Sequence, residues 1–157
     1  MGKAAAKGEL PVCQNPKALH SYEIEERFEA GMVLMGSEVK SMRGRKANLE
    51  GAYATIDDGN LVLHQMHVGP YEQAGRFGHE VRRSRRLLAH RQEIQRLLGK
   101  LAQRAYTLVP LRVYFKDGRA KVELGLGKGR KRGDDRETIR RDLDMREARE
   151  ATLRGRR

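Results

Sequence analysis

The chain of 157 residues is 38% apolar and 34% charged, and it carries a formal charge of +12. Its single cysteine, Cys13, excludes an internal disulfide framework and fits a reducing cytoplasm. No apolar run approaches the ~20 residues of a membrane-spanning helix, and the first residues show no secretory signal, so we expect no membrane partner. The excess of basic residues is concentrated in residues 76–104 and 128–157, which favours a nucleic-acid partner.

The first part of the chain alternates between extended and irregular patterns. Residues 1–14 show no periodicity and are predicted to form a flexible N-terminal arm. Apolar residues at alternate positions predict a half-buried strand over 21–28, which residues 29–31 should interrupt before an extended stretch over 32–35. A glycine stop and a serine N-cap then predict a short helix over 38–43.

The middle and the end contain two hairpin signals and one helical pattern. Strands are predicted over 51–57 and 61–66, joined by an Asp-Asp-Gly-Asn turn. Apolar residues spaced three and four apart predict the longest helix, and they are Leu87, Leu88, Ile94, Leu97, Leu98 and Leu101. Strands over 111–116 and 120–126, around an Asp-Gly turn, should form the last hairpin.

These elements predict a mainly β protein of about six strands with one short and one long helix. Many short strands with a helix among them are typical of a small closed barrel, in which every strand edge is paired. We assign this barrel to residues 15–132. Residues 133–157 follow a basic linker and are predicted to be a basic C-terminal tail. It should be disordered when free, because its few apolar residues make an isolated helix marginal.

Catalytic and metal-binding patterns are weak in this sequence. His64 and His67 are three residues apart at the end of a predicted strand, where they should face opposite sides, so we expect neither a metal nor a cofactor. The carboxylates that could pair for acid–base catalysis are Glu25, Glu26, Glu29 and Glu38. Nothing groups two of them in one cleft, so we expect no enzymatic activity, with a barrel nuclease as the competing class.

Four arginines within five positions give the strongest binding signal, in the segment Arg82-Arg83-Ser84-Arg85-Arg86. Like charges this close repel one another, a cost that usually accompanies a phosphate partner. The glycines at 125, 127 and 129 lack the strand and helix context of a phosphate-binding loop. The residues alone therefore predict a barrel without enzymatic activity that binds RNA or DNA.

Several longer motifs in the sequence allow a more specific prediction. Among them are Glu29-Ala30-Gly31, Gly36-Ser37-Glu38-Val39-Lys40-Ser41, Arg86-Leu87-Leu88-Ala89-His90 and Lys116-Asp117-Gly118-Arg119-Ala120-Lys121. Over about residues 15–132 these motifs closely resemble the core of the small protein B family, the bacterial partner of transfer-messenger RNA (SsrA RNA) in trans-translation.

The resemblance implies an oligonucleotide-binding (OB) type of closed β-barrel that binds the tRNA-like domain of transfer-messenger RNA. The protein would deliver this RNA to stalled ribosomes, so that incomplete peptides are tagged, and DNA is not expected as a partner. Elongation factor Tu is a further candidate partner in the delivery complex. The implied RNA contacts are Asn15, Lys17, His20, Glu29, Leu88, His90 and Lys121. The alternative is a ribosome-associated RNA-binding barrel without specificity for transfer-messenger RNA.

The resemblance extends into the tail. A basic Gly-Lys-Lys stretch of the family is matched by Gly129-Arg130-Lys131, and its Asp-Lys-Arg signature reads Asp134-Asp135-Arg136 here. Asp135 therefore reverses one charge where the family has a lysine. The implied ribosome contacts are Gly129, Arg130, Lys131, Asp134 and Arg136. They would meet the decoding region of the small subunit, with the tail becoming helical in the empty message channel.

Overall fold

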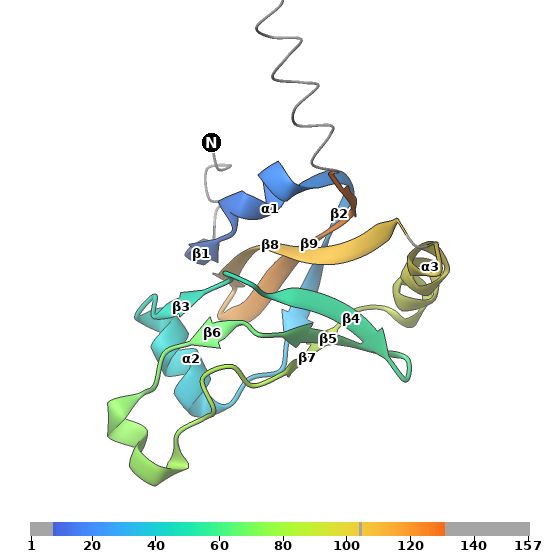
Figure 1. Ribbon diagram of the computed structural model, residues 1–157. Coiled ribbons are helices and arrows are strands. Elements are labelled where there is room, and N and C mark those ends of the chain that lie inside the picture. The colour runs from blue at the N-terminus through green and yellow to red at the C-terminus, as the bar shows by residue number, and fades with distance from the viewer. Residues whose placement is uncertain (1–7, 104, 131–157) are drawn as a thin grey trace, which may run out of the picture.

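The computed structural model describes residues 8–103 and 105–130, a mainly β arrangement with short helices (Figure 1). The strands are β1 (Glu9–Gln14), β2 (Tyr22–Met32), β3 (Ala47–Asn48), β4 (Tyr53–Asp57), β5 (Asn60–His64), β6 (His67–Val68), β7 (Arg85–Leu88), β8 (Tyr106–Lys116) and β9 (Arg119–Gly129). The helices are α1 (Pro16–Ser21), α2 (Gly36–Arg43), the 3-10 helix η1 (Glu72–Phe77) and α3 (Arg91–Leu101). Within this part of the chain, no helix is long and apolar enough to cross a membrane.

Six strands pair in a closed cycle. The order is β8-β4-β5-β7-β2-β9, and β9 pairs in turn with β8 along most of its length. All these pairings are antiparallel, and the β4–β8 pairing is a single step between Ala54 and Leu108. Inward side chains fill the interior of the cycle, among them Leu61, Leu63, Leu87, Leu108, Val113, Val122, Leu124 and Leu126. In Figure 1, α2 and α3 lie on opposite sides of these strands.

Both predicted hairpins are confirmed. The turns place Asp58 and Gly59 at φ 49° and 78°, and Asp117 and Gly118 at φ 51° and 78°. Two successive positive φ values match the right-handed twist of the flanking strands, and Asp-Gly is among the pairs that adopt them most readily. The last hairpin is longer than predicted, because β8 and β9 stay paired to Tyr106 and Lys128.

Gly125 and Gly127 of β9 allow close packing against β2. This agrees with the expectation that these glycines do not form a phosphate-binding loop. A Cβ at Gly127 would lie 2.4 Å from the carbonyl oxygen of Glu23, and one at Gly125 would lie 3.0 Å from Ile24. The β2–β9 register shifts between Ile24 and Glu26, where the strands approach. Backbone proximity at this irregularity therefore explains both glycines.

Three expected elements are wrong. Residues 9–14, expected within a flexible arm, form β1, which pairs with β8 through five residue pairs from Glu9↔Lys116 to Gln14↔Arg112. The expected break at residues 29–31 is absent, because β9 pairs with β2 across this whole stretch. Leu87 and Leu88 belong to β7 rather than to the long helix, which begins only at Arg91.

Candidate nucleic-acid interface

Leu88, Gly31 and Lys121 form one row across three strands. Gly31 of β2 pairs with Leu88 of β7 on one side and with Lys121 of β9 on the other. A Cβ at Gly31 would lie 3.4 Å from Leu88 Cβ and 3.7 Å from Lys121 Nζ, so both side chains flank the space that the glycine leaves. Leu88 is 56% exposed whereas Leu87 is 2% exposed, as strand alternation requires.

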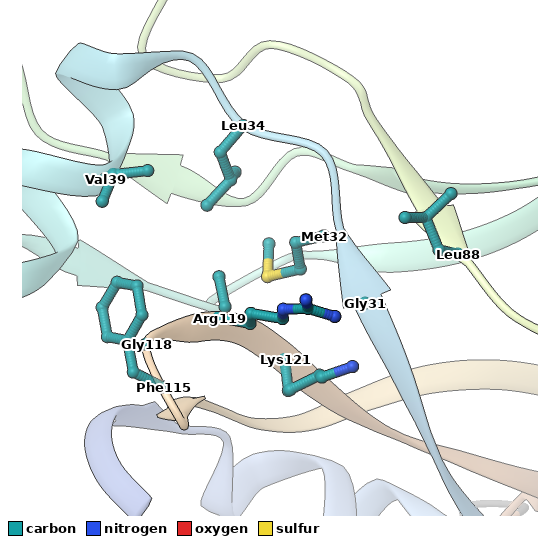
Figure 2. Close-up of a pocket in the computed structure, with 10 residues that line it drawn as sticks. Gly31, Met32, Leu34, Val39, Leu88, Phe115, Gly118, Arg119 and Lys121 are labelled. Carbon is teal, nitrogen blue, oxygen red and sulfur yellow. The ribbon is translucent and has the colours of Figure 1, made fainter.

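A cleft of about 290 Å³ opens beside this row (Figure 2). Its apolar lining consists of Met32, Leu34, Val39, Phe115, Ala120 and Leu88. Figure 2 shows Arg119 and Lys121 extending their nitrogen atoms towards Gly31, so that one side of the apolar lining is cationic. An apolar surface bordered by cations suits an unstacked base with its phosphate.

Glu29 lies two residues before Gly31 on the same face of β2, and its carboxylate is held in place. Tyr114 of β8 donates its hydroxyl hydrogen bond to Glu29 Oε2, and Lys116 Nζ lies 3.6 Å from the same oxygen. Tyr114 is 2% exposed, and the Arg112 guanidinium stacks 4.1 Å from its ring centre. Burial, followed by the hydrogen bond to Glu29, raises the pKa of Tyr114, so the phenol stays protonated and donates. Sequence reasoning missed Tyr114, since nothing local links it to Glu29.

His90 lies two residues after Leu88 and is the exposed N-cap residue of α3. The structure therefore brings together four of the seven predicted RNA contacts, Glu29, Leu88, His90 and Lys121. It does not bring the other three to them. Tyr22 and Gly31, at opposite ends of β2, are separated by roughly 30 Å at the rise of an extended strand, and α1 adjoins Tyr22.

The other three predicted RNA contacts, Asn15, Lys17 and His20, form a second cluster on α1 and its N-cap. Lys17 Nζ pairs with Glu50 at 2.9 Å, with both side chains about three-quarters exposed. Asn15 Nδ2 donates to the Pro110 carbonyl at 3.0 Å, a contact that ties α1 to β8. His20 is exposed in the last turn of the helix. A cleft of about 350 Å³ adjoins α1, lined in part by Asn15, Lys17 and Tyr53.

The last described residues, Gly129 and Arg130, lie beside this second cluster. Gly129 pairs with Tyr22, and the backbone N–H of Arg130 donates to the Ser21 carbonyl at 2.9 Å. The chain therefore leaves β9 at the α1 end of the fold, away from Gly31. Lys131, Asp134 and Arg136 lie outside the described residues.

The arginine segment is only partly available to a ligand, which corrects its interpretation as four phosphate-binding residues. Arg85 is fully buried and donates to Glu38, to Met66 O at 2.8 Å and to Val81 O at 3.2 Å. Arg83 also donates to the buried Glu38 carboxylate. Burial alone would raise the pKa of Glu38, but hydrogen bonds from Arg83, the Met35 N–H and Arg85 together lower it. Arg82 and Arg86, in contrast, are exposed.

The carboxylates considered for catalysis are dispersed. Glu25 accepts from Tyr106 at 2.8 Å and Glu26 pairs with Arg96, while Glu38 belongs to α2 and is fully buried. In the described ranges, no three His, Cys, Asp or Glu side chains gather as a metal site would require.

Comparisons with known proteins all point to one family. A family model described as "SmpB protein" matches residues 12–154. An SsrA-binding protein of Geobacter metallireducens is 51% identical over 144 residues, which are 92% of this chain and 94% of the relative. That of Desulforudis audaxviator is 57% identical over 135 residues, covering 86% and 88%. A solved structure described as "tmRNA-SmpB: a journey to the center of the bacterial ribosome" matches with a TM-score of 0.66 and 45% identity, covering 85% of this chain and 97% of that chain.

Proposed function

Because this chain belongs to the SmpB protein family, we propose that it binds transfer-messenger RNA and delivers it to stalled ribosomes for trans-translation. The observation that carries the proposal at atomic level is the row of Leu88, Gly31 and Lys121 beside the cleft. It places an exposed apolar side chain and a cation on one face, next to a carboxylate that is fixed by Tyr114.

These groups have complementary tasks in RNA recognition. Lys121 contacts a phosphate, Leu88 packs against an unstacked base, and Glu29 accepts from a base or ribose donor. A carboxylate repels phosphate, so Glu29 favours an RNA whose donors fit it over an arbitrary polyanion. His90 hydrogen-bonds or stacks at the same end. The α1 cluster of Asn15, Lys17 and His20 contacts a second part of the RNA.

We also propose that the fold is an OB-type β-barrel. The closed cycle of six antiparallel strands supports an OB-type barrel with α3 inserted before the last hairpin. We assign the protein to the cytoplasm, where ribosomes stall, and to the class of adaptors that catalyse no reaction. The dispersal of Glu25, Glu26 and Glu38 supports the latter assignment.

Residues 133–157 act as a ribosome-binding tail, separate from the surface that binds transfer-messenger RNA. The exit of the chain beside α1, at the end of β2 opposite Gly31, supports this separation. Truncation after Arg132 should leave affinity for the tRNA-like domain nearly unchanged and abolish peptide tagging. Loss of RNA binding on truncation would refute the two-surface arrangement.

RNA binding is tested by gel shift of the full chain with a transcribed tRNA-like domain at physiological salt. Bulk tRNA and duplex DNA serve as competitors. We expect the tRNA-like domain to bind more tightly than either competitor. Equal affinity for all three would refute the specificity and favour a general ribosome-associated RNA-binding protein.

A further inference from the structure

A second cleft lies on the other side of Leu88. Its volume is about 250 Å³, and it is bounded by the β4–β5 turn, by β7 and by the start of α3. The lining residues are Gly59, Asn60, Leu61, Arg86, Leu87, Leu88, Ala89, Arg91 and Ile94. Leu88 lines both this cleft and the one beside Lys121, so it forms a ridge between them.

The cleft carries positive charge that the fold leaves unused. Arg86 and Arg91 line it from two different elements and are both exposed. Neither makes an ion pair or a side-chain hydrogen bond with any residue in the described ranges, whereas Arg83, Arg85 and Arg96 each pair with a glutamate. The described residues that line this cleft include no aspartate or glutamate.

Backbone contacts on both sides of Arg86 restrict its position. Arg86 pairs with Val62 of β5, and its carbonyl accepts from the Val33 N–H at 3.0 Å. Arg91 is the first residue of α3, which packs through the buried Leu97. Two guanidinium groups, one on a strand that is hydrogen-bonded on both sides and one at the start of a packed helix, offer forked donors that fit phosphate oxygens.

We propose that this cleft is a phosphate subsite, in which Arg86 and Arg91 bind the RNA backbone next to the nucleotide that contacts Leu88. The subsite rests on the proposed binding of the tRNA-like domain. An RNA strand that crosses the Leu88 ridge meets Lys121 and Arg119 on one side and Arg86 and Arg91 on the other. Both phosphates that flank the contacted base are then neutralised.

The test is the salt dependence of affinity for the transcribed tRNA-like domain. Each phosphate contact contributes about one to the slope of log Kd against log salt concentration. We expect Arg86→Gln and Arg91→Gln each to lower this slope by about one and to weaken binding about fivefold to tenfold at physiological salt. Arg86→Lys, which keeps the charge, should retain most of the slope. Arg76→Gln, an exposed arginine of η1, is the matched control and should change neither quantity.

Three outcomes overturn the subsite. One is an unchanged slope and affinity in the Arg86→Gln and Arg91→Gln variants. Another is lower affinity at an unchanged slope, which assigns these arginines to base edges. The third is a loss in Arg76→Gln as large as in the other two, which assigns the effect to overall charge. In all three, preferential binding of the tRNA-like domain by the unmodified chain keeps the proposed function intact. Failure of the unmodified chain to prefer that RNA refutes the function itself.

Discussion

Replacing Arg85 by methionine should lower the free energy of unfolding more than replacing any exposed arginine. Arg85 and Glu38 are both fully buried, and the arginine joins α2 to Met66 O and Val81 O. Methionine fills much of the same volume without donating a hydrogen bond. The variant therefore keeps the packing and leaves the Glu38 carboxylate with only Arg83 and the Met35 N–H as partners.

The expected loss follows from the burial of the remaining charge. Removing one partner of a buried ion pair costs about 3–5 kcal/mol in unfolding free energy, a large part of the ~5–15 kcal/mol that a domain has. With a urea m-value of about 2 kcal/mol/M, a loss near 4 kcal/mol lowers the midpoint by about 2 M. The double variant Glu38→Met/Arg85→Met should recover much of this loss, because no unpaired carboxylate remains.

Urea unfolding followed by circular dichroism measures these midpoints. Arg96→Met is the matched control, because Arg96 pairs with Glu26 at the surface, where the side chains are 47% and 41% exposed. An exposed pair contributes at most about 1 kcal/mol. If Arg85→Met lowers the unfolding free energy no more than Arg96→Met does, the buried cluster of Arg85 and Glu38 does not hold α2 against β7.

Three further predictions concern Lys121, Tyr114 and Glu38. Lys121→Glu should weaken binding of the tRNA-like domain by about 1–3 kcal/mol in a gel shift, and unchanged affinity would remove Lys121 from the interface. Tyr114→Phe should lower the preference for that RNA over bulk tRNA by freeing the Glu29 carboxylate, and it should have no further effect in a Glu29→Gln background; additive effects would contradict the link. The pKa of Glu38 is lower in the folded state than in the unfolded state. The stabilisation that its carboxylate gives is therefore complete at a pH above the unfolded-state pKa, and it is lost as the pH falls through the folded-state pKa. Glu38→Gln should therefore show a flatter stability profile in acid, and an equally steep one would contradict this origin.

Local signals predicted the parts of the fold that depend on neighbouring residues. The hairpins were predictable because Asp58-Gly59 and Asp117-Gly118 adopt their turn conformations on their own. Strand β7 was not predictable, because Arg85 is charged yet buried, and its partner Glu38 is distant in the sequence. Arg85 and Leu87 are the buried, alternating residues of β7. If Arg85 is taken for a surface residue, this strand pattern is lost, and Leu87 and Leu88 fit the apolar pattern of the following helix instead.

For the candidate site, too, contacts between residues far apart in the sequence could not be predicted. Motif resemblance named Glu29, Leu88, His90 and Lys121, but only strand register shows that Gly31 seats Leu88 and Lys121 side by side. Charge counting overstated the arginine segment, because it could not see that Glu38 binds Arg83 and Arg85. It also assigned Tyr114 no role, since the contact with Glu29 joins strands that are far apart in sequence.

Peptide tagging in a reconstituted translation reaction is the most direct test of the proposed role in trans-translation. The reaction contains a message without a stop codon, transfer-messenger RNA and this chain as the only SmpB-family protein. Tagged peptide should form when the unmodified chain is present, and Lys121→Glu should reduce its amount. Absence of tagged peptide with the folded 157-residue chain, or equal tagging without it, would refute the proposed function.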